Sequence, residues 1–533
     1  MLPTPKITRK QAFNWIGIWL ALVITAWFCR PLLPYHELGT AGITWEMWVS
    51  DNFWLPTLNG ELVDESYPLV HWLEIFVWKI FGVSEFSIRF LAAVFSISTL
   101  FLTALAAKQL WPELPKVRAN APLILIGSLM WAVFATAHVE QVYVAFFLLL
   151  YINFLIRAWK YNPYWWFAVS FSLLLGFLVT GVSFLIYALP ILLTFPFWAQ
   201  KYWRMYLYSL IALIVAFLTF WTWGYWVKAQ YYEMSPSLTA IMGLPRLISQ
   251  INDPMPFGMT FLSLIIVLFP WVFWLPLYKN FSYVDKREPA FKFCASWLVS
   301  SLIIVLITMK TSIVPLIPIY PAFCLLIARI YFPITNRPKD VVLVSIVIAL
   351  LGILLIVLSI VHIWIDDNNA IEWLSTVSPL WGIGLLVFSG MLLLFAKETR
   401  LITLALMSVA LTLAFNFGVI RNARDFYDVM PASERISWYQ DKGYVVANNG
   451  RYMGQYHFLG RLEDPLIVIN DEIDFTRFKT LYPSGRIVVY LDSMTPRTSK
   501  IAEYYQPFRN RYLAIFAVSD LENIGSVTQK ARK

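Results

Sequence analysis

The chain has 533 residues, of which 59% are hydrophobic and only 14% are charged. Soluble domains carry roughly a quarter of charged residues, so this composition excludes an ordinary soluble protein. The net charge is +9, but the Lys and Arg residues do not form clusters interleaved with aromatic residues. This distribution excludes a nucleic-acid-binding groove.

Apolar runs long enough to cross a bilayer recur along the chain, since a helix needs roughly 20 apolar residues to span the hydrocarbon core. We predict thirteen transmembrane helices, over residues 12–29, 86–110, 121–138, 141–158, 163–179, 182–198, 204–226, 259–278, 291–309, 312–331, 341–364, 378–396 and 401–418. The first run lacks a small-residue cleavage site and ends at Cys29, so we interpret it as an anchor. The three cysteines lie in or beside these runs and show no metal or disulfide spacing.

Lysine and arginine are shared unevenly between the loops on the two sides of the predicted helices. With the N-terminus inside, the inner loops hold 19 basic residues and the outer loops hold six. Because basic residues favour the cytoplasmic side, we predict a cytoplasmic N-terminus. The odd helix count then places the C-terminal tail outside the cytoplasm.

A long outer loop, residues 30–85, follows the first predicted helix. It contains eight acids, which are Glu37, Glu46, Asp51, Glu61, Asp64, Glu65, Glu74 and Glu85. Two stretches, 38–49 and 68–82, are amphipathic and rich in Trp and Phe, which is typical of helices lying at a membrane interface. We expect Glu74 and Lys79 to lie on the exposed face of the second helix.

The composition changes sharply at about residue 420. The tail holds 16 of the 41 basic residues and 13 of the 32 acids. Runs 466–469, 486–491 and 512–518 predict strands, and the stretches 451–460 and 471–481 have helical spacing. The sequence therefore predicts a helical membrane domain over 1–419 and a small extracytoplasmic α/β domain over 420–533.

Residues 36–95 resemble the outer-loop signature of the integral-membrane GT-C glycosyltransferases, and above all of the lipid A aminoarabinose transferases and protein O-mannosyltransferases. In that family an Asp-Glu pair follows the first helix, a Glu-Lys-Pro-Pro-Leu-x-x-Trp segment opens a juxtamembrane helix, and a Phe-Gly segment leads into the second span. Here "HE" (36–37), "LNG" (58–60), "ESYPLVHW" (65–72) and "FGVSEFSIR" (81–89) stand in the same order.

The resemblance implies a mostly helical fold in the bacterial inner membrane and a transferase with a polyprenyl-phosphate-linked sugar donor. The acceptor would be a lipid A or other glycolipid, a glycan or a protein at the outer face. Such a reaction needs a base or electrostatic partner for the acceptor hydroxyl and cations for the leaving phosphate. The resemblance implies catalytic roles for Glu37 and His36, with donor-side roles for Lys310 and Glu65.

Several positions depart from the family's pattern. His36 stands where the family has its catalytic Asp, and Ser66 stands where it has the Lys of the Glu-Lys-Pro segment. His138 and Glu140 share a short outer turn and are further donor-side candidates. No cofactor is indicated, and a divalent metal stays open because His36 and Glu65 would supply only a partial site.

Three functions fit these observations to different degrees. The first is an active glycosyltransferase. The second is a family member that has lost catalysis and binds a lipid-linked sugar or a partner. The third is a transporter or flippase, which is predicted to carry ionisable residues within its spans; the thirteen runs are almost free of them away from their ends.

Overall fold

The computed structural model describes residues 14–63, 66–230, 237–251, 264–308, 312–331, 338–361, 374, 376–395 and 401–522. Contacts divide the chain into two compact units. We call them the membrane unit (residues 1–26, 64–350 and 385–413) and the loop–tail unit (residues 27–63, 351–384 and 414–533). The first part of the long outer loop is thus grouped with the tail, although the predicted boundary assigns all of that loop to the helical domain.

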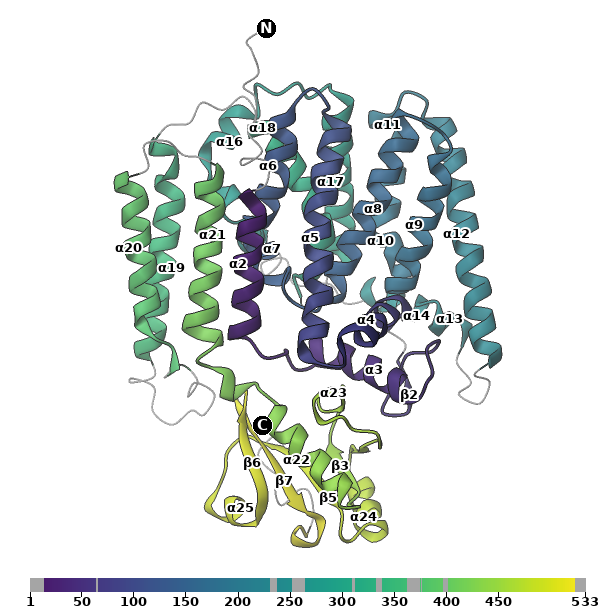
Figure 1. Cartoon of the computed structure of the whole chain (residues 1–533), viewed down its shortest axis with the longest axis vertical. Helices are drawn as coiled ribbons and strands as arrows, with labels where there is room; N and C mark the ends of the chain where they lie inside the picture. Colours follow the sequence, from purple (N-terminus) through teal and green to yellow (C-terminus); the bar gives the residue numbers. More distant parts are fainter. Residues whose placement is uncertain are drawn as a thin grey trace. The chain divides into compact units, whose positions relative to one another are not determined.

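The membrane unit consists of helices (Figure 1). Their bounds are α2 Asn14–Cys29, α4 Pro68–Phe81, α5 Glu85–Leu110, α6 Pro115–Ile126, α7 Leu129–Phe134, α8 Glu140–Lys160, α9 Trp165–Thr180, η1 Gly181–Phe184, α10 Leu185–Leu193, α11 Phe195–Trp198, α12 Tyr202–Gln230, α13 Leu238–Ile241, α14 Leu244–Ile251, η3 Trp271–Phe273, α16 Leu275–Asn280, α17 Pro289–Thr308, η4 Val314–Ile319, α18 Tyr320–Tyr331 and η5 Pro338–Val341. Three more helices have one end assigned to the loop–tail unit, namely α19 Val342–Val361, α20 Pro379–Phe395 and α21 Leu401–Phe415, and the last three residues of α2, 27–29, are assigned to it as well.

The multi-pass helical architecture is confirmed, whereas the count of thirteen spans is not. Among the described residues, eight helical segments are long and apolar enough to cross a membrane, and α2 and Pro379–Leu394 are shorter apolar helices. One of the eight, Trp165–Trp198, covers two of the predicted spans. The chain leaves α9 at Gly181 with φ +61°, a conformation that glycine adopts without strain.

Local sequence explains where the helices around the outer loop begin and end. Pro68 occupies the first turn of α4, where its missing N–H is not needed, and Gly82 closes that helix with φ +78°. Ser84 starts α5 through a capping box with Ser87, whose backbone N–H it accepts. The predicted amphipathic stretch 68–82 therefore forms a helix whose start and end are set by Pro68 and Gly82.

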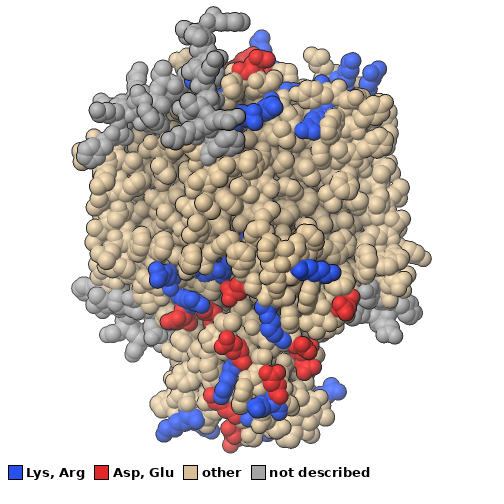
Figure 2. Space-filling model, in the orientation of Figure 1, with Lys and Arg blue, Asp and Glu red and all other residues tan. Residues whose placement is uncertain are grey.

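Several helices of the membrane unit pack on helices that come soon after them in the chain. α5 packs on α6 and α8, α8 on α9, and α9 on α12, while α4 packs against α5 and α9. Figure 2 shows a wide belt without charged side chains over the middles of the helices, with Lys and Arg gathered at helix ends. This pattern is expected for helices whose middles face hydrocarbon.

The loop–tail unit combines one helix and one hairpin of the outer loop with the α/β tail. Its bounds are α3 Glu37–Val49, β1 Thr57–Leu58, β2 Glu61–Leu62, η7 Asn416–Ile420, η8 Arg424–Phe426, α22 Met430–Asp441, β3 Val446–Asn449, α23 His457–Gly460, β4 Ile467–Ile469, α24 Glu472–Leu481, β5 Arg486–Leu491, α25 Pro496–Ile501, β6 Ala502–Phe508, β7 Arg511–Ala517 and η9 Val518–Asp520. The small sheet predicted for the tail is present, and the predicted amphipathic stretch 38–49 is helix α3.

The sheet has the order β4-β3-β5-β7-β6. β3 runs parallel to β4 and β5, whereas β7 pairs antiparallel with β5 and β6. The three predicted strands are β4, β5 and β7. Two strands were not predicted, β3, which ends in two asparagines, and β6, which contains Pro507, because Asn and Pro are disfavoured in strands.

One face of this sheet forms an apolar core with α24. Phe475 and Phe478 of α24 pack with Ile487, Val489 and Phe516 of the strands, and each of these side chains is buried. The side chains of β5 alternate between two faces with period two, so Ile487 and Val489 point to the same side. The tail therefore contains a hydrophobic core of its own.

Helix α3 approaches the tail closely through two glycines. A Cβ atom added at Gly39 would lie 3.0 Å from the Met453 carbonyl oxygen, and one at Gly42 would lie 2.9 Å from the Gly454 carbonyl oxygen. Trp45, three residues further on, donates its indole N–H to the Leu462 carbonyl oxygen at 2.8 Å. Positions three apart share a helix face, so one face of α3 is fitted to the backbone around α23.

Gly42→Ala should therefore destabilise the protein, because its methyl group would overlap a backbone oxygen that has little room to move. We expect a loss on the order of 1–3 kcal/mol, the usual cost of overpacking, measured as a lower unfolding temperature of the purified protein. Gly17→Ala is the matched control, since a Cβ on that helical glycine meets nothing within 4 Å. Equal unfolding temperatures for the two variants would contradict this packing.

Candidate functional site

Glu37, the first residue of α3, has a fully buried side chain in the loop–tail unit. Its Oε1 accepts a hydrogen bond from Arg30 Nη2 at 3.0 Å, and its Oε2 accepts one from the Leu33 backbone N–H at 2.7 Å. Arg30 is itself only 9% exposed. The carboxylate is thus held in a buried ion pair that ties the start of α3 to the chain before it.

His36, the neighbouring candidate, has a different environment. Its side chain is exposed, and its backbone N–H donates to the Pro34 carbonyl oxygen at 2.9 Å in the turn before α3. The two adjacent candidates therefore present different surfaces: the imidazole of His36 is accessible to solvent, whereas the carboxylate of Glu37 points inward to Arg30.

The "LNG" motif has a structural role in the loop–tail unit. Asn59 and Gly60 both have positive φ and connect β1 to β2, as a two-residue hairpin turn requires. Glu46 accepts the backbone N–H groups of both residues, at 2.5 and 3.0 Å. The Asn59 side chain exchanges two hydrogen bonds with the Leu466 backbone, at 2.7 and 2.8 Å. The hairpin is thereby fastened to the tail.

A buried chain of polar side chains lies in the membrane unit. Glu74 Oε1 is 2.6 Å from His138 Nε2, and Glu74 Oε2 is 3.9 Å from His71 Nδ1. At one end, His71 Nε2 is 2.6 Å from the Ser66 hydroxyl oxygen; at the other, His138 Nδ1 is 2.5 Å from the Tyr143 hydroxyl oxygen. We call these five residues the Glu74 chain. It connects the segment before α4 to the start of α8.

The prediction that Glu74 lies on an exposed face is wrong, because its side chain is fully buried. His71, Glu74 and Trp78 share one helical face, and this face points into the unit, whereas Lys79 is exposed. Burial lowers the pKa of His71 to about 4, so its imidazole is neutral at neutral pH. This cluster was not predicted from the sequence, because a glutamate on an amphipathic helix usually faces water.

His138 and Glu140, which stand two residues apart at the start of α8, make separate contacts. His138 is buried against Glu74, whereas Glu140 forms an ion pair with Arg246 of α14, with 2.9 Å between Oε2 and Nη2. Glu140 and Arg246 keep 26% and 13% of their side-chain surface exposed. The two candidates therefore belong to different polar groups within the membrane unit.

Two further candidates, Glu65 and Lys310, lie outside the described residues. The partial metal site considered for His36 and Glu65 lies partly outside them for the same reason. Within the described ranges, no three His, Cys, Asp or Glu side chains are grouped so as to hold a metal ion.

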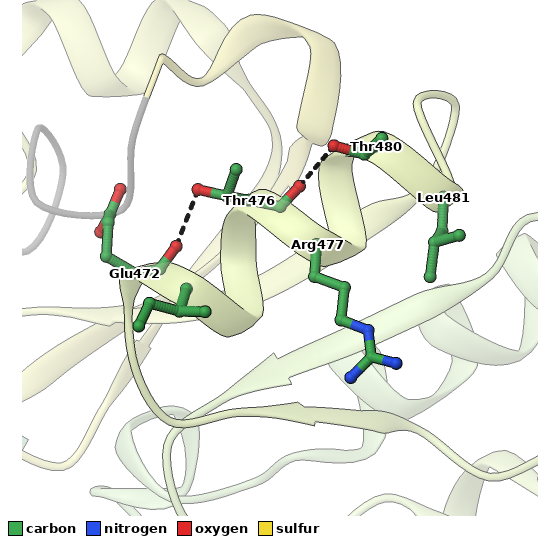
Figure 3. Close-up of a pocket in the computed structure, with 6 residues that line it drawn as sticks. Glu472, Thr476, Arg477, Thr480 and Leu481 are labelled. Atoms are coloured by element: carbon green, nitrogen blue, oxygen red, sulfur yellow. Dashed lines mark hydrogen bonds between the residues drawn. The ribbon is translucent and has the colours of Figure 1, made fainter.

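A shallow hollow of the tail is lined by a single helix, α24. Figure 3 shows that the Thr476 hydroxyl bonds to the Glu472 carbonyl oxygen and the Thr480 hydroxyl to that of Thr476, each at 2.8 Å. Arg477 and Leu481 complete the labelled lining. Since the threonine hydroxyls are bonded within the helix, this hollow does not group side chains in a pattern that suggests chemistry.

Comparison with solved structures gives a strong structural likeness. ArnT from Cupriavidus metallidurans, solved bound to undecaprenyl phosphate, superposes with a TM-score of 0.70 over 95% of this chain and 98% of its own, at 16% identity. The same protein in the apo state gives a TM-score of 0.71 over the same shares of the two chains, at 16% identity. The two chains have the same fold. No protein-family model matches this chain.

Two relatives of known name are similar in sequence. Undecaprenyl phosphate-alpha-4-amino-4-deoxy-L-arabinose arabinosyl transferase 2 from Pseudomonas fluorescens is 24% identical over 54% of this chain and 53% of its own length. Transferase 1 of the same description from Proteus mirabilis is 23% identical over 42% of each chain. The chain thus spans about half the length of these relatives or less.

The ion pair of Arg30 and Glu37 should be important for stability. Removing one member of a buried pair typically costs about 3–5 kcal/mol, because the other charge loses its partner. Glu37→Gln should therefore lower the unfolding temperature clearly, and Arg30→Met should do the same. The double variant should recover most of the loss, because no unmatched charge remains. Strictly additive losses in this double-mutant cycle would show that the two side chains are not coupled.

Proposed function

We propose that this chain, which has the fold of the integral-membrane GT-C glycosyltransferases, transfers a sugar from a polyprenyl-phosphate donor to lipid A or a related glycolipid. The observation that carries the proposal is the sequence similarity to two transferases named for an undecaprenyl phosphate-linked aminoarabinose. The fold supports it, because the neighbour with that fold was solved with undecaprenyl phosphate bound. A glycan or a protein is the alternative acceptor that the sequence allows.

In the proposed reaction the acceptor oxygen attacks the anomeric carbon, the bond from that carbon to the phosphate oxygen breaks, and the acceptor loses its proton. A positioned base contributes typically 10²–10⁴-fold to such a step, and cations stabilise the departing phosphate. We propose Lys310 and Glu65 for the donor side. His138 and Glu140 would support that side through the groups with which they pair, Glu74 and Arg246.

We propose different roles for Glu37 and His36. Both oxygens of Glu37 accept hydrogen bonds, and its charge is paired with Arg30, so we assign it an electrostatic role that also fixes the start of α3. The side chain of His36 is exposed, so an acceptor hydroxyl can reach it. We assign it the orientation of that hydroxyl, with imidazole as donor or acceptor.

A second function, binding of a lipid-linked sugar without catalysis, is favoured by the same ion pair. Both oxygens of the fully buried Glu37 carboxylate already accept hydrogen bonds, from Arg30 and from the Leu33 N–H, so an acceptor hydroxyl does not reach them. If no other residue supplied the base, the chain would keep the fold and the donor site but lose turnover.

For topology, we propose a cytoplasmic N-terminus and an extracytoplasmic tail in the bacterial inner membrane. The support is the excess of basic residues in alternate loops, 19 against six. In this orientation the outer-loop residues, including His36 and Ser66, lie on the same side as the tail.

The function is tested with the purified full-length protein in lipid, undecaprenyl phosphate-linked aminoarabinose as donor and lipid A as acceptor. We expect lipid A to gain the mass of one aminoarabinose residue, and we expect the same species to disappear from cells that lack the gene. Donor binding without any mass gain on lipid A, on other glycolipids, on glycans or on proteins would favour the binding function.

The topology is tested by single cysteines in a variant whose native cysteines are replaced. Cys29, Cys294 and Cys324 are all buried. A cysteine introduced at residue 440, on α22, should react with a membrane-impermeant maleimide in intact spheroplasts, whereas one at residue 201, in a predicted inner loop, should react only after permeabilisation. The reverse labelling pattern would invert the topology and place the outer loop in the cytoplasm.

A further inference from the structure

The surroundings of the two histidines in the Glu74 chain favour one tautomer for each ring. Neutral histidine carries one N–H and one lone pair, and the partner of one ring nitrogen decides which nitrogen is protonated. Glu74 Oε2 lies 3.9 Å from His71 Nδ1, too far for a hydrogen bond, but its negative charge favours the proton on Nδ1. His71 Nε2 then accepts the hydrogen bond of the Ser66 hydroxyl at 2.6 Å. At the other end, Tyr143 donates to His138 Nδ1, and His138 Nε2–H faces Glu74. Both ends therefore direct their protons toward one carboxylate.

Burying the polar side chains of the Glu74 chain costs free energy. Glu74 and His138 are fully enclosed and His71 is 1% exposed. A buried carboxylate loses its hydration, and this loss is unfavourable unless neighbouring groups compensate for it. A single hydrogen bond between α4 and α8 would serve packing alone. An enclosed carboxylate held between two histidines, with a half-buried hydroxyl at one end, is the arrangement that activates a hydroxyl in acid–base catalysis.

We infer that Ser66, His71 and Glu74 form a proton relay in which Ser66 takes the proton of the acceptor hydroxyl and passes its own to His71. This inference rests on the proposed function and supplies the base that the buried Glu37 does not. Ser66 is the catalytic residue in it, since it would touch the acceptor. His71, Glu74 and His138 are positioning residues that act through Ser66.

The proton step balances as follows. As the acceptor oxygen bonds to the anomeric carbon, its proton moves to Ser66 Oγ while the Ser66 proton moves to His71 Nε2. The bond between the anomeric carbon and the phosphate oxygen breaks, and its electron pair leaves with polyprenyl phosphate. Because burial lowers the pKa of His71, the imidazolium that forms 3.9 Å from Glu74 Oε2 keeps this proton only briefly. The proton leaves through the half-buried Ser66 hydroxyl before the next turnover.

The relay is tested by three variants of the full-length protein in lipid. Ser66→Ala and His71→Gln should each lower kcat by about 10² or more, the contribution of a positioned acid–base group, with KM for donor and acceptor changed by less than about threefold. Ser66→Thr should keep most of the activity, because it retains the hydroxyl. Lys79→Gln, on the exposed side of α4, is the matched control and should behave like the wild type.

A kcat within threefold of wild type in folded Ser66→Ala and His71→Gln would overturn the relay. A purely structural role would instead lower the unfolding temperature of His71→Gln and leave kcat per folded molecule unchanged. Since Ser66 is half-buried and its replacement removes one oxygen atom, Ser66→Ala should fold even if substitutions at His71 disturb the buried chain.

A second measurement separates failure of the relay from failure of the proposed function. Diisopropyl fluorophosphate reacts with an activated serine: a Ser66 Oγ–phosphorus bond forms, fluoride leaves, and His71 takes the proton. Mass spectrometry should find Ser66 modified in the wild type at least about tenfold faster than in His71→Gln. This labelling without any sugar transfer would reject the transferase and retain the activated serine; equal labelling of the two proteins would reject the relay, whatever the transfer assay shows.

Discussion

The hydrocarbon core of a membrane offers no partner for backbone N–H and C=O groups, and this constraint organises the rest of the structure. A helix satisfies these groups within one segment, so the long apolar runs form helices such as α5, α8 and α12. The same medium penalises charge, so Lys and Arg gather at the helix ends (Figure 2). Polar side chains suited to chemistry are thereby concentrated in the loops and at the helix ends.

Glu74 departs from the usual placement of a carboxylate. It lies on a short helix before the first long span of the membrane unit, with its side chain enclosed and not facing water. The i,i+3 spacing brings His71 onto the same face, and the turn before α8 supplies His138. The 2.6 Å contact of Glu74 Oε1 with His138 Nε2 offsets part of the free-energy cost of taking the carboxylate charge out of water.

The loop–tail unit shows a different way of positioning residues. Two glycines and one indole fit α3 to the backbone around α23, and Asn59 fastens the hairpin to Leu466. Glu37 and His36 stand at the start of the helix that is held in this way. The tail therefore holds α3 and the hairpin of the outer loop in place by packing. Motif residues such as Asn59 and Gly60 form the turn of that hairpin.

Much of the fold follows from local patterns in the sequence. Apolar runs predict the membrane helices, Pro68 and Gly82 delimit α4, and β-branched runs predict β4, β5 and β7, because each of these signals depends on neighbours within one element. The strands β3 and β6 were not predicted. They contain polar residues and a proline that are unfavourable in strands, and pairing with neighbouring strands compensates for this.

The placement of the site residues depended on tertiary structure. The sequence predicts a catalytic role for Glu37 and an exposed position for Glu74, yet the side chains of both are enclosed by partners: Arg30 for Glu37 and His138 for Glu74. Ser66 and His71 are near neighbours in sequence, but only the fold brings His138 and Tyr143 to the same chain. Sequence spacing determines which residues share a helix face, whereas burial and the partner across the interface are decided by how the helices pack.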